Sequence, residues 1–132
     1  MSPRRLIVIF STTVVIACGS ARPSDTFPAT DLARMTWSEV TSRARGSTVR
    51  YAMWAGDEAR NRFYQGATAD ALRRDLDITL TIVPLADTSD LVSKLVTEKA
   101  AGLSRGSVDL VWINGANFRT AKQAGILWGP FV

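Results

Sequence analysis

The chain has 132 residues, which suits one ordinary domain and is too short for two large ones. Apolar residues make up 46% of it and charged residues 21%, so its composition is that of a globular protein. The formal net charge is +4, but the basic residues are scattered, so no nucleic-acid-binding patch is expected. There is no histidine, which argues against hydrolase triads and ordinary zinc sites. We expect no metal and no cofactor.

The N-terminus has the pattern of a lipoprotein signal peptide. Arg4 and Arg5 form a basic region, and the apolar run that follows is too short to span a bilayer. It ends in Val-Ile-Ala-Cys at positions 15–18, which resembles the bacterial lipobox, where the cysteine is lipidated. We therefore expect removal of residues 1–17 and lipidation of Cys18. The alternatives are an ordinary signal peptide with a chance cysteine, or a buried free thiol. Without Arg4 and Arg5 the side-chain charge falls to +2.

Residues 18–35 are rich in Ser, Pro, Thr and Asp, which predicts a flexible tether. The folded part is then expected over residues 36–132. It begins with a helix whose start is marked by Thr36 and Glu39, the two positions of a capping box, and whose end is marked by Gly46.

The first strand is predicted at Val49–Trp54 from its β-branched and aromatic residues. Asp57 can cap a helix that runs to about Arg74. Four residues at helical spacing predict the face that packs on the sheet: Ala59, Phe63, Ala67 and Ala71.

The second strand is predicted at Ile78–Val83, with Pro84 ending it. Its alternation of apolar residues with threonines favours an edge strand, because one face needs no cover. Asp87 can cap the next helix, whose apolar residues recur at helical spacing as far as Leu103.

A third strand, Val108–Ile113, is almost continuously apolar, which predicts burial on both faces. A short helix from about Gly115 to Ala124 follows, and Gly125 is suited to end it. Strands that alternate with helices imply a parallel sheet with right-handed crossovers. The fold class is therefore α/β, a three-layer open parallel sheet with flanking helices.

Two polar loops, Trp54–Asp57 and Asn114–Phe118, follow the first and third strands. Loops at the carboxyl edge of an open parallel sheet commonly hold ligands. Gly56 and Gly115 allow close backbone approach, and helix N-termini favour anions. We expect a ligand site there, with an aromatic face from one side chain and polar groups from three others: Trp54, Asp57, Asn114 and Asn117.

Structural roles compete with these assignments. Asp57 and Asn114 can serve only as helix caps, and the glycines can serve turn geometry alone. Trp112 lies in the apolar run and is expected in the core, while Asp109 is expected to make a structural hydrogen bond.

Three segments resemble a known family: Trp-Ala-Gly-Asp at 54–57 followed by Asn61, Glu-Lys-Ala-Ala-Gly at 98–102, and the stretch from Val108 to Phe118. They look like the first lobe of a type II periplasmic (extracellular) solute-binding protein of an ABC importer, in its YnjB-like branch. The lipobox and the Ala-Gly-Ile-Leu turn at 124–127 agree with this resemblance.

The resemblance implies a solute-binding lipoprotein without catalytic activity. It would capture a small solute in a cleft between two lobes and deliver it to the permease and ATPase subunits of an importer. Cys18 would anchor it at the outer face of the cytoplasmic membrane or in the periplasm. Family members are about three times as long, so this sequence is expected to hold only the N-terminal lobe. The implied strand order, 2-1-3, would leave the third strand as an exposed apolar edge in the isolated chain, prone to association.

Two other function classes compete with solute binding. An enzyme with a covalently attached cofactor would need a nucleophile, whereas the single cysteine lies in the lipobox and no histidine is present to activate a serine. A truncated lipoprotein that acts only through protein–protein interaction, without solute binding, is the main alternative.

Overall fold

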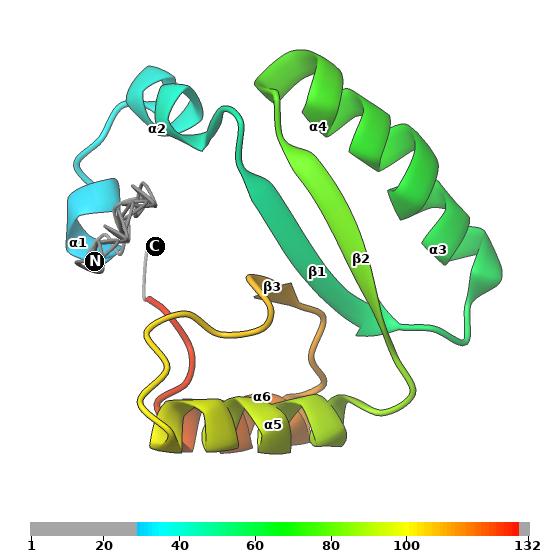
Figure 1. Ribbon diagram of the computed structural model, residues 1–132, viewed down its shortest axis with the longest axis vertical. Helices are drawn as coiled ribbons and strands as arrows, with labels where there is room; N and C mark the ends of the chain where they lie inside the picture. Colours follow the sequence, from blue (N-terminus) through cyan, green and yellow to red (C-terminus); the bar gives the residue numbers. More distant parts are fainter. Residues whose placement is uncertain (1–28, 130–132) are drawn as a thin grey trace, which may run out of the picture.

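The computed structural model describes residues 29–129 (Figure 1), so the predictions for the signal peptide, for Cys18 and for residues 18–28 lie outside the described residues. The elements in chain order are α1 (Ala29–Leu32), α2 (Trp37–Ala44), β1 (Thr48–Trp54), α3 (Glu58–Phe63), the π-helical segment η1 (Tyr64–Thr68), α4 (Ala69–Leu76), β2 (Thr79–Leu85), α5 (Thr88–Ala100), β3 (Leu110–Val111) and α6 (Gly115–Gln123). Among them, no helix is both long and apolar enough to cross a membrane.

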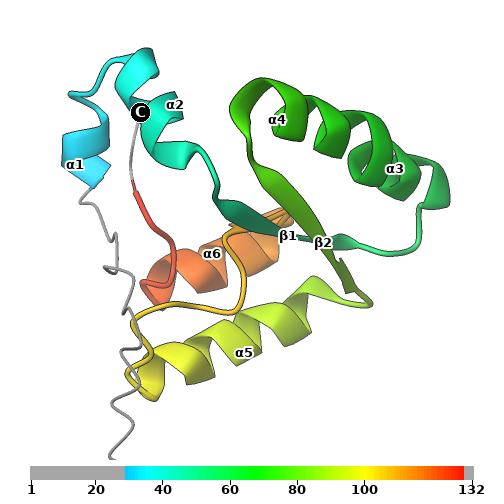
Figure 2. The same ribbon diagram turned by 45° about the horizontal axis from the view of Figure 1, so that its top comes forward.

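The three strands form a small open parallel sheet in the order β2-β1-β3. β1 and β2 pair along their whole length, from Thr48 opposite Thr79 to Trp54 opposite Leu85. Helices α3 and α4 lie on one side of the sheet, and α5 and α6 lie on the other (Figure 2). The α/β class and the expected strand order are therefore confirmed.

The core lies between the sheet and α5. Ala52 is fully buried and packs with Leu85 and Leu91, and partly buried residues from the strands and α5 surround them: Val83, Leu95, Val108 and Val111. On the other face Met53 is fully buried, and the ring of Tyr51 meets that of Tyr64 edge-on at 5.4 Å. Alternate residues of β1 thus serve the two helical layers, as the strand period requires.

β2 extends beyond its predicted end, because Pro84 lies inside the strand and pairs with Met53. Proline cannot donate a backbone hydrogen bond, so it is tolerated in strands that have a free side. β2 is such an edge strand in this sheet, as its threonine alternation predicted.

The predicted sheet-facing side of the next helix is wrong for three of its four residues. Ala59, Phe63 and Ala67 are exposed, with Phe63 at 59%, whereas Ala71 is half-buried as predicted. Half-buried residues recur one position later than the predicted ones, at Tyr64, Thr68 and Leu72, and the ring of Tyr64 meets that of Tyr51 on β1. The mismatch is already present in α3, before the π-helical segment begins at Tyr64.

β3 is much shorter than predicted and is not buried on both faces. Leu110 is 52% exposed and Trp112, which was expected in the core, is 47% exposed. Val111 packs toward α5, whereas Leu110 and Trp112 alternate with it and lie on the opposite face. On that face α4 and η1 pack on β2, which lies across β1 from β3 (Figure 1). An exposed apolar face on β3 is thus present, while association through it stays a prediction.

Asp109 holds the start of β3 against β1, as its predicted structural hydrogen bond required. Its carboxylate accepts hydrogen bonds from the backbone N–H, Nε and Nη2 of Arg50, each at 2.9 Å. Hydrogen bonding by the Arg50 side chain is the main reason that the pKa of Asp109 is lowered. Arg50 also donates from Nη2 to the Gly106 carbonyl at 2.8 Å. One guanidinium thus binds both ends of the segment from Gly106 to Asp109, which precedes β3.

The capping box predicted for the first helix of the folded part is confirmed. Thr36 and Glu39 form the capping box of α2, with the Glu39 carboxylate 2.7 Å from the Thr36 N–H. Within the segment predicted as a tether, residues 29–32 form the short helix α1. Leu32 lines an apolar hollow of about 440 Å³ together with residues of α2 and the C-terminal segment.

Candidate functional site

The two predicted loops do lie at one edge of the sheet. β1 ends at Trp54, and the chain beyond β3 stays beside it, because the Trp112 N–H donates to the Ala52 carbonyl at 2.9 Å. Parallel neighbouring strands present their carboxyl ends on the same side. Trp54 and Trp112 are 49% and 47% exposed, so two indole rings stand at this edge, partly open to solvent.

The first loop is held by two hydrogen bonds to the backbone of Ala55. The Ala55 N–H donates to the Leu85 carbonyl at 2.9 Å, and Asn61 Nδ2 donates to the Ala55 carbonyl at the same distance. A Cβ at Gly56 would overlap the indole of Trp54. The glycine therefore gives the tryptophan room to fold back over its own loop.

Asp57 and Asn114 are both helix caps. Asp57 Oδ1 accepts from the Arg60 N–H at 3.0 Å, and Asn114 Oδ1 accepts from the Asn117 N–H at 3.1 Å. Each cap leaves part of its side chain for other partners: Oδ2 of Asp57 and the amide nitrogen of Asn114. The structural alternative is thus confirmed for both, and a ligand-binding role stays a prediction.

Gly115 and Asn117 belong to the first turn of α6. A Cβ at Gly115 would meet nothing within 4 Å, so neither packing nor backbone conformation requires glycine there. Asn117 is half-buried and gives its backbone N–H to the cap. These two residues lie at the expected edge, and their predicted contact with a ligand is not tested by the fold.

Arg60 joins the two loops, and the sequence analysis missed it. Its guanidinium carbon lies 3.9 Å from the ring centroid of Trp112 and 6.0 Å from that of Trp54. A cation over the face of an indole is attracted by the ring quadrupole. Arg60 thus connects α3 with the ends of β1 and β3.

Two polar atoms beside these rings are buried without a hydrogen-bond partner, Arg60 Nε and Asn61 Oδ1. The nearest carboxylate contact of Arg60 is Nη2 to Asp57 Oδ2 at 3.8 Å, which is an ion pair longer than a hydrogen bond. Unsatisfied polar atoms are costly and call for an explanation. Their position marks this edge as a polar cluster with unused hydrogen-bonding capacity.

One sequence signal could have identified Arg60. It lies three residues after the capping Asp57, and side chains three apart share one helix face. Because α3 starts at the predicted site, an arginine on the same helix face as its N-cap Asp57 can reach the other site residues. That it stacks on Trp112 required knowing that Trp112 is exposed.

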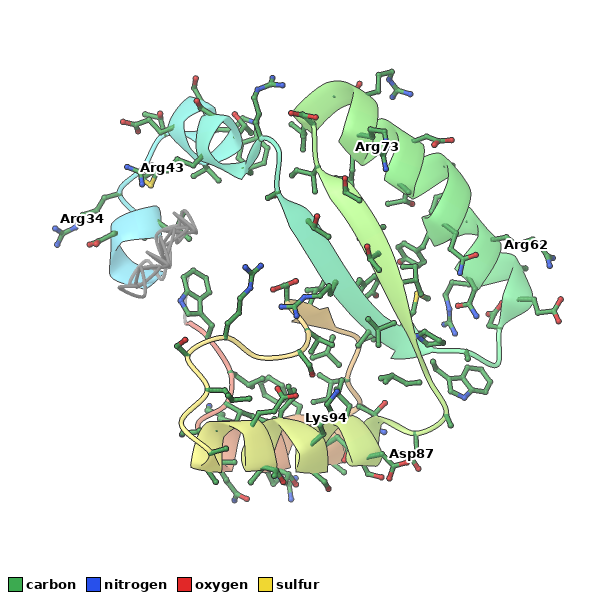
Figure 3. The ribbon with its side chains drawn as sticks, viewed as in Figure 1. Arg34, Arg43, Arg62, Arg73, Asp87 and Lys94 are labelled. Carbon is green, nitrogen blue, oxygen red and sulfur yellow. The ribbon has the colours of Figure 1, made fainter. Side chains whose placement is uncertain are left out.

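A second hollow, of about 240 Å³, has none of the predicted site residues in its lining. It is lined by the end of β2, the first turns of α5 and the turn before β3, and it includes Asp87 and Lys94 (Figure 3). The Asp87 carboxylate accepts the Ser89 N–H at 2.8 Å, and this hydrogen bond lowers the pKa of Asp87. Asp87 is thus the N-cap of α5. Over residues 29–129, no three acidic, histidine or cysteine side chains gather as a metal site would need.

Comparison with known proteins gives one informative similarity. Over 92 residues the chain is 45% identical to protein YnjB of Escherichia coli strain K12. The chain is related to YnjB. The matched stretch makes up 69% of this chain and 24% of YnjB, so the chain spans about a quarter of that relative's length. No family model matches the chain, and no solved structure matches it.

Proposed function

We propose that this protein is a solute-binding lipoprotein of an ABC importer and that the described domain is the first lobe of a type II binding protein. The observation that carries the proposal is the meeting of two loops at the carboxyl edge of β1 and β3, with two exposed indoles and Arg60 between them. Edges of this kind are where open α/β sheets bind small molecules. The strand order and the relationship to YnjB are consistent with the resemblance of the sequence motifs to this family.

In this proposal the site is one wall of a cleft, and a second lobe supplies the other. Trp54 gives an apolar face, while Asp57, Asn114 and Asn117 orient the polar groups of the solute. The partners are the importer's permease and ATPase subunits, and catalysis plays no part. Lipidated Cys18 holds the protein at the outer face of the cytoplasmic membrane or in the periplasm; incorporation of labelled palmitate that is lost in Cys18→Ser tests this anchor.

The binding proposal is tested by a thermal-shift screen of the two-lobed form with thiamine, polyamines, ferric complexes, sugars and phosphonates. A ligand at 100 times its Kd stabilises the folded state by about 2.7 kcal/mol, which gives a measurable shift. Trp54→Ala should reduce the response, whereas Trp37→Ala, which removes a 73% exposed indole on α2, should not. Absence of a shift with every solute would count against solute binding.

A second candidate function is an interaction lipoprotein that binds a protein partner and no solute. The observation favouring it is the open face of β3 and the residues after it, where Leu110 and Trp112 are 52% and 47% exposed. Apolar groups gathered on a surface commonly mark interfaces. A co-purified partner that protects this face from hydrogen exchange would support it, and a monomer that binds solute would exclude it.

A further inference from the structure

The described residues contain two half-buried arginines whose surroundings differ sharply. The Arg50 guanidinium donates three hydrogen bonds at 2.8–2.9 Å, to Asp109 and the Gly106 carbonyl, so its donors are occupied by the fold. The Arg60 guanidinium donates none to any described residue and has one ion pair, at 3.8 Å to Asp57. Arg60 is therefore held in place while its donors stay available.

Arg60 is held by the indoles rather than by hydrogen bonds. The guanidinium carbon lies 3.9 Å from the Trp112 centroid and 6.0 Å from that of Trp54, and the side chain keeps 25% of its surface exposed. Nε is the one guanidinium nitrogen that is buried without an acceptor, so the two terminal nitrogens keep access to solvent. Stacking leaves the planar edge of a guanidinium free, and that edge matches the two oxygens of a carboxylate or phosphate.

Asp57 does not hydrogen-bond to the guanidinium donors of Arg60. Its Oδ1 accepts the Arg60 backbone N–H at 3.0 Å, and its Oδ2 stays 3.8 Å from Nη2, beyond hydrogen-bond distance. The carboxylate thus acts as a helix cap and offsets part of the charge without occupying the donors. The exposed halves of Trp54 and Trp112 flank the guanidinium and offer apolar surface to the rest of a ligand.

We propose that Arg60 binds an oxyanion group, a carboxylate or phosphate, of a small solute whose apolar or aromatic body lies against Trp54 and Trp112. This inference specifies the class of solute that the proposed cleft binds, and it rests on the solute-binding function proposed above. It predicts that the solute is an organic anion or zwitterion rather than a neutral sugar or a polyamine.

The test is a titration of the full chain, labelled with 15N at the tryptophan indoles, with inorganic phosphate and separately with acetate at constant ionic strength. The indole N–H resonances are assigned with Trp54→Phe and Trp112→Phe. We expect saturable shifts of these two resonances with at least one anion, and the stronger of the two titrations tells phosphate from carboxylate. Arg60→Gln should weaken that binding about tenfold or more, because charged hydrogen bonds are lost.

Arg62→Gln is the matched control, because Arg62 is two residues away, 70% exposed and pointed away from the sheet (Figure 3). It should leave the titration unchanged. Arg60→Lys keeps the positive charge over the indoles but loses the planar fork, so it should bind more weakly than the wild type while remaining folded. If Arg60→Gln fails to fold, this lysine variant carries the comparison.

The outcomes separate this inference from the proposed function. Indole shifts that are absent in the wild type, or unchanged in both Arg60 variants, would overturn the anion site and would show Arg60 to be a structural clamp between the tryptophans. That result leaves solute binding standing if a neutral solute stabilises the protein. Anion-dependent shifts that are lost with Arg60, together with no response to any organic solute, would support the site and count against the importer function.

Discussion

Replacing Asp109 with asparagine should destabilise the domain by about 2 kcal/mol. Asp109 accepts three hydrogen bonds from Arg50, and the two guanidinium donors would face the neutral amide after the change. A hydrogen bond to a charged group contributes roughly 1.5–3 kcal/mol. Both side chains are 29% exposed and the asparagine amide oxygen can still accept, so the loss is expected to be about 2 kcal/mol, less than the sum over the separate hydrogen bonds.

Urea-induced unfolding measures this loss directly. With a slope near 2 kcal/mol per molar urea, the midpoint should fall by about 1 M. The control is Asp75→Asn, which breaks another Arg–Asp pair whose side chains are 69% and 57% exposed and adjacent in sequence. That change should cost less than about 0.5 kcal/mol. Equal losses in the two variants would refute the idea that the Arg50–Asp109 contact fastens β3 to β1.

Three further predictions concern acid stability, a cap and a glycine. Hydrogen bonds lower the folded-state pKa of Asp109, so its contribution is complete above its unfolded pKa of about 4 and is lost as pH falls through the lower folded value. Between about pH 5 and pH 2, the stability of Asp109→Asn should therefore fall less steeply than that of the wild type, and an equal fall in both would contradict this. Asn114→Ala should cost about 1 kcal/mol in thermal unfolding while Asn114→Ser costs little, since serine can accept the Asn117 N–H, and equal losses would show that the cap is not the cause. Gly56→Ala should displace the Trp54 indole and change its fluorescence with a stability loss below about 1 kcal/mol, because an exposed ring can move away; an unchanged spectrum would contradict the overlap at Cβ.

Local chemistry accounts for what the sequence predicted well. Thr36, Asp57, Asp87 and Asn114 all cap the helices expected of them, since capping depends on residues a few positions apart. The order of β2, β1 and β3 came from the family resemblance, and right-handed crossovers are consistent with it.

The wrong predictions concern which parts of the sheet the helices pack on, because the local sequence does not determine this. The apolar run at β3 gave no sign that α4 would stop over β2, so Trp112 was placed in the core although it stands exposed. Arg60 was missed for the same reason, because its partner is an indole that had been assigned to the interior. The predicted helix face was one residue out of phase from its first position, Ala59, because alanine spacing alone does not determine which side of a helix meets the sheet.

The π-helical segment has a consequence for how this chain can vary in length. It joins α4, which packs on β2, to α3, which carries Arg60 to the indoles (Figure 1). Removing one residue from the wide turn would restore a regular helix and rotate the first stretch by about 100° relative to the second. Gln65 and Ala67 are exposed and can be exchanged freely, yet neither can be deleted. In sequences that share this domain, we expect substitutions between positions 64 and 68 and no single-residue gaps.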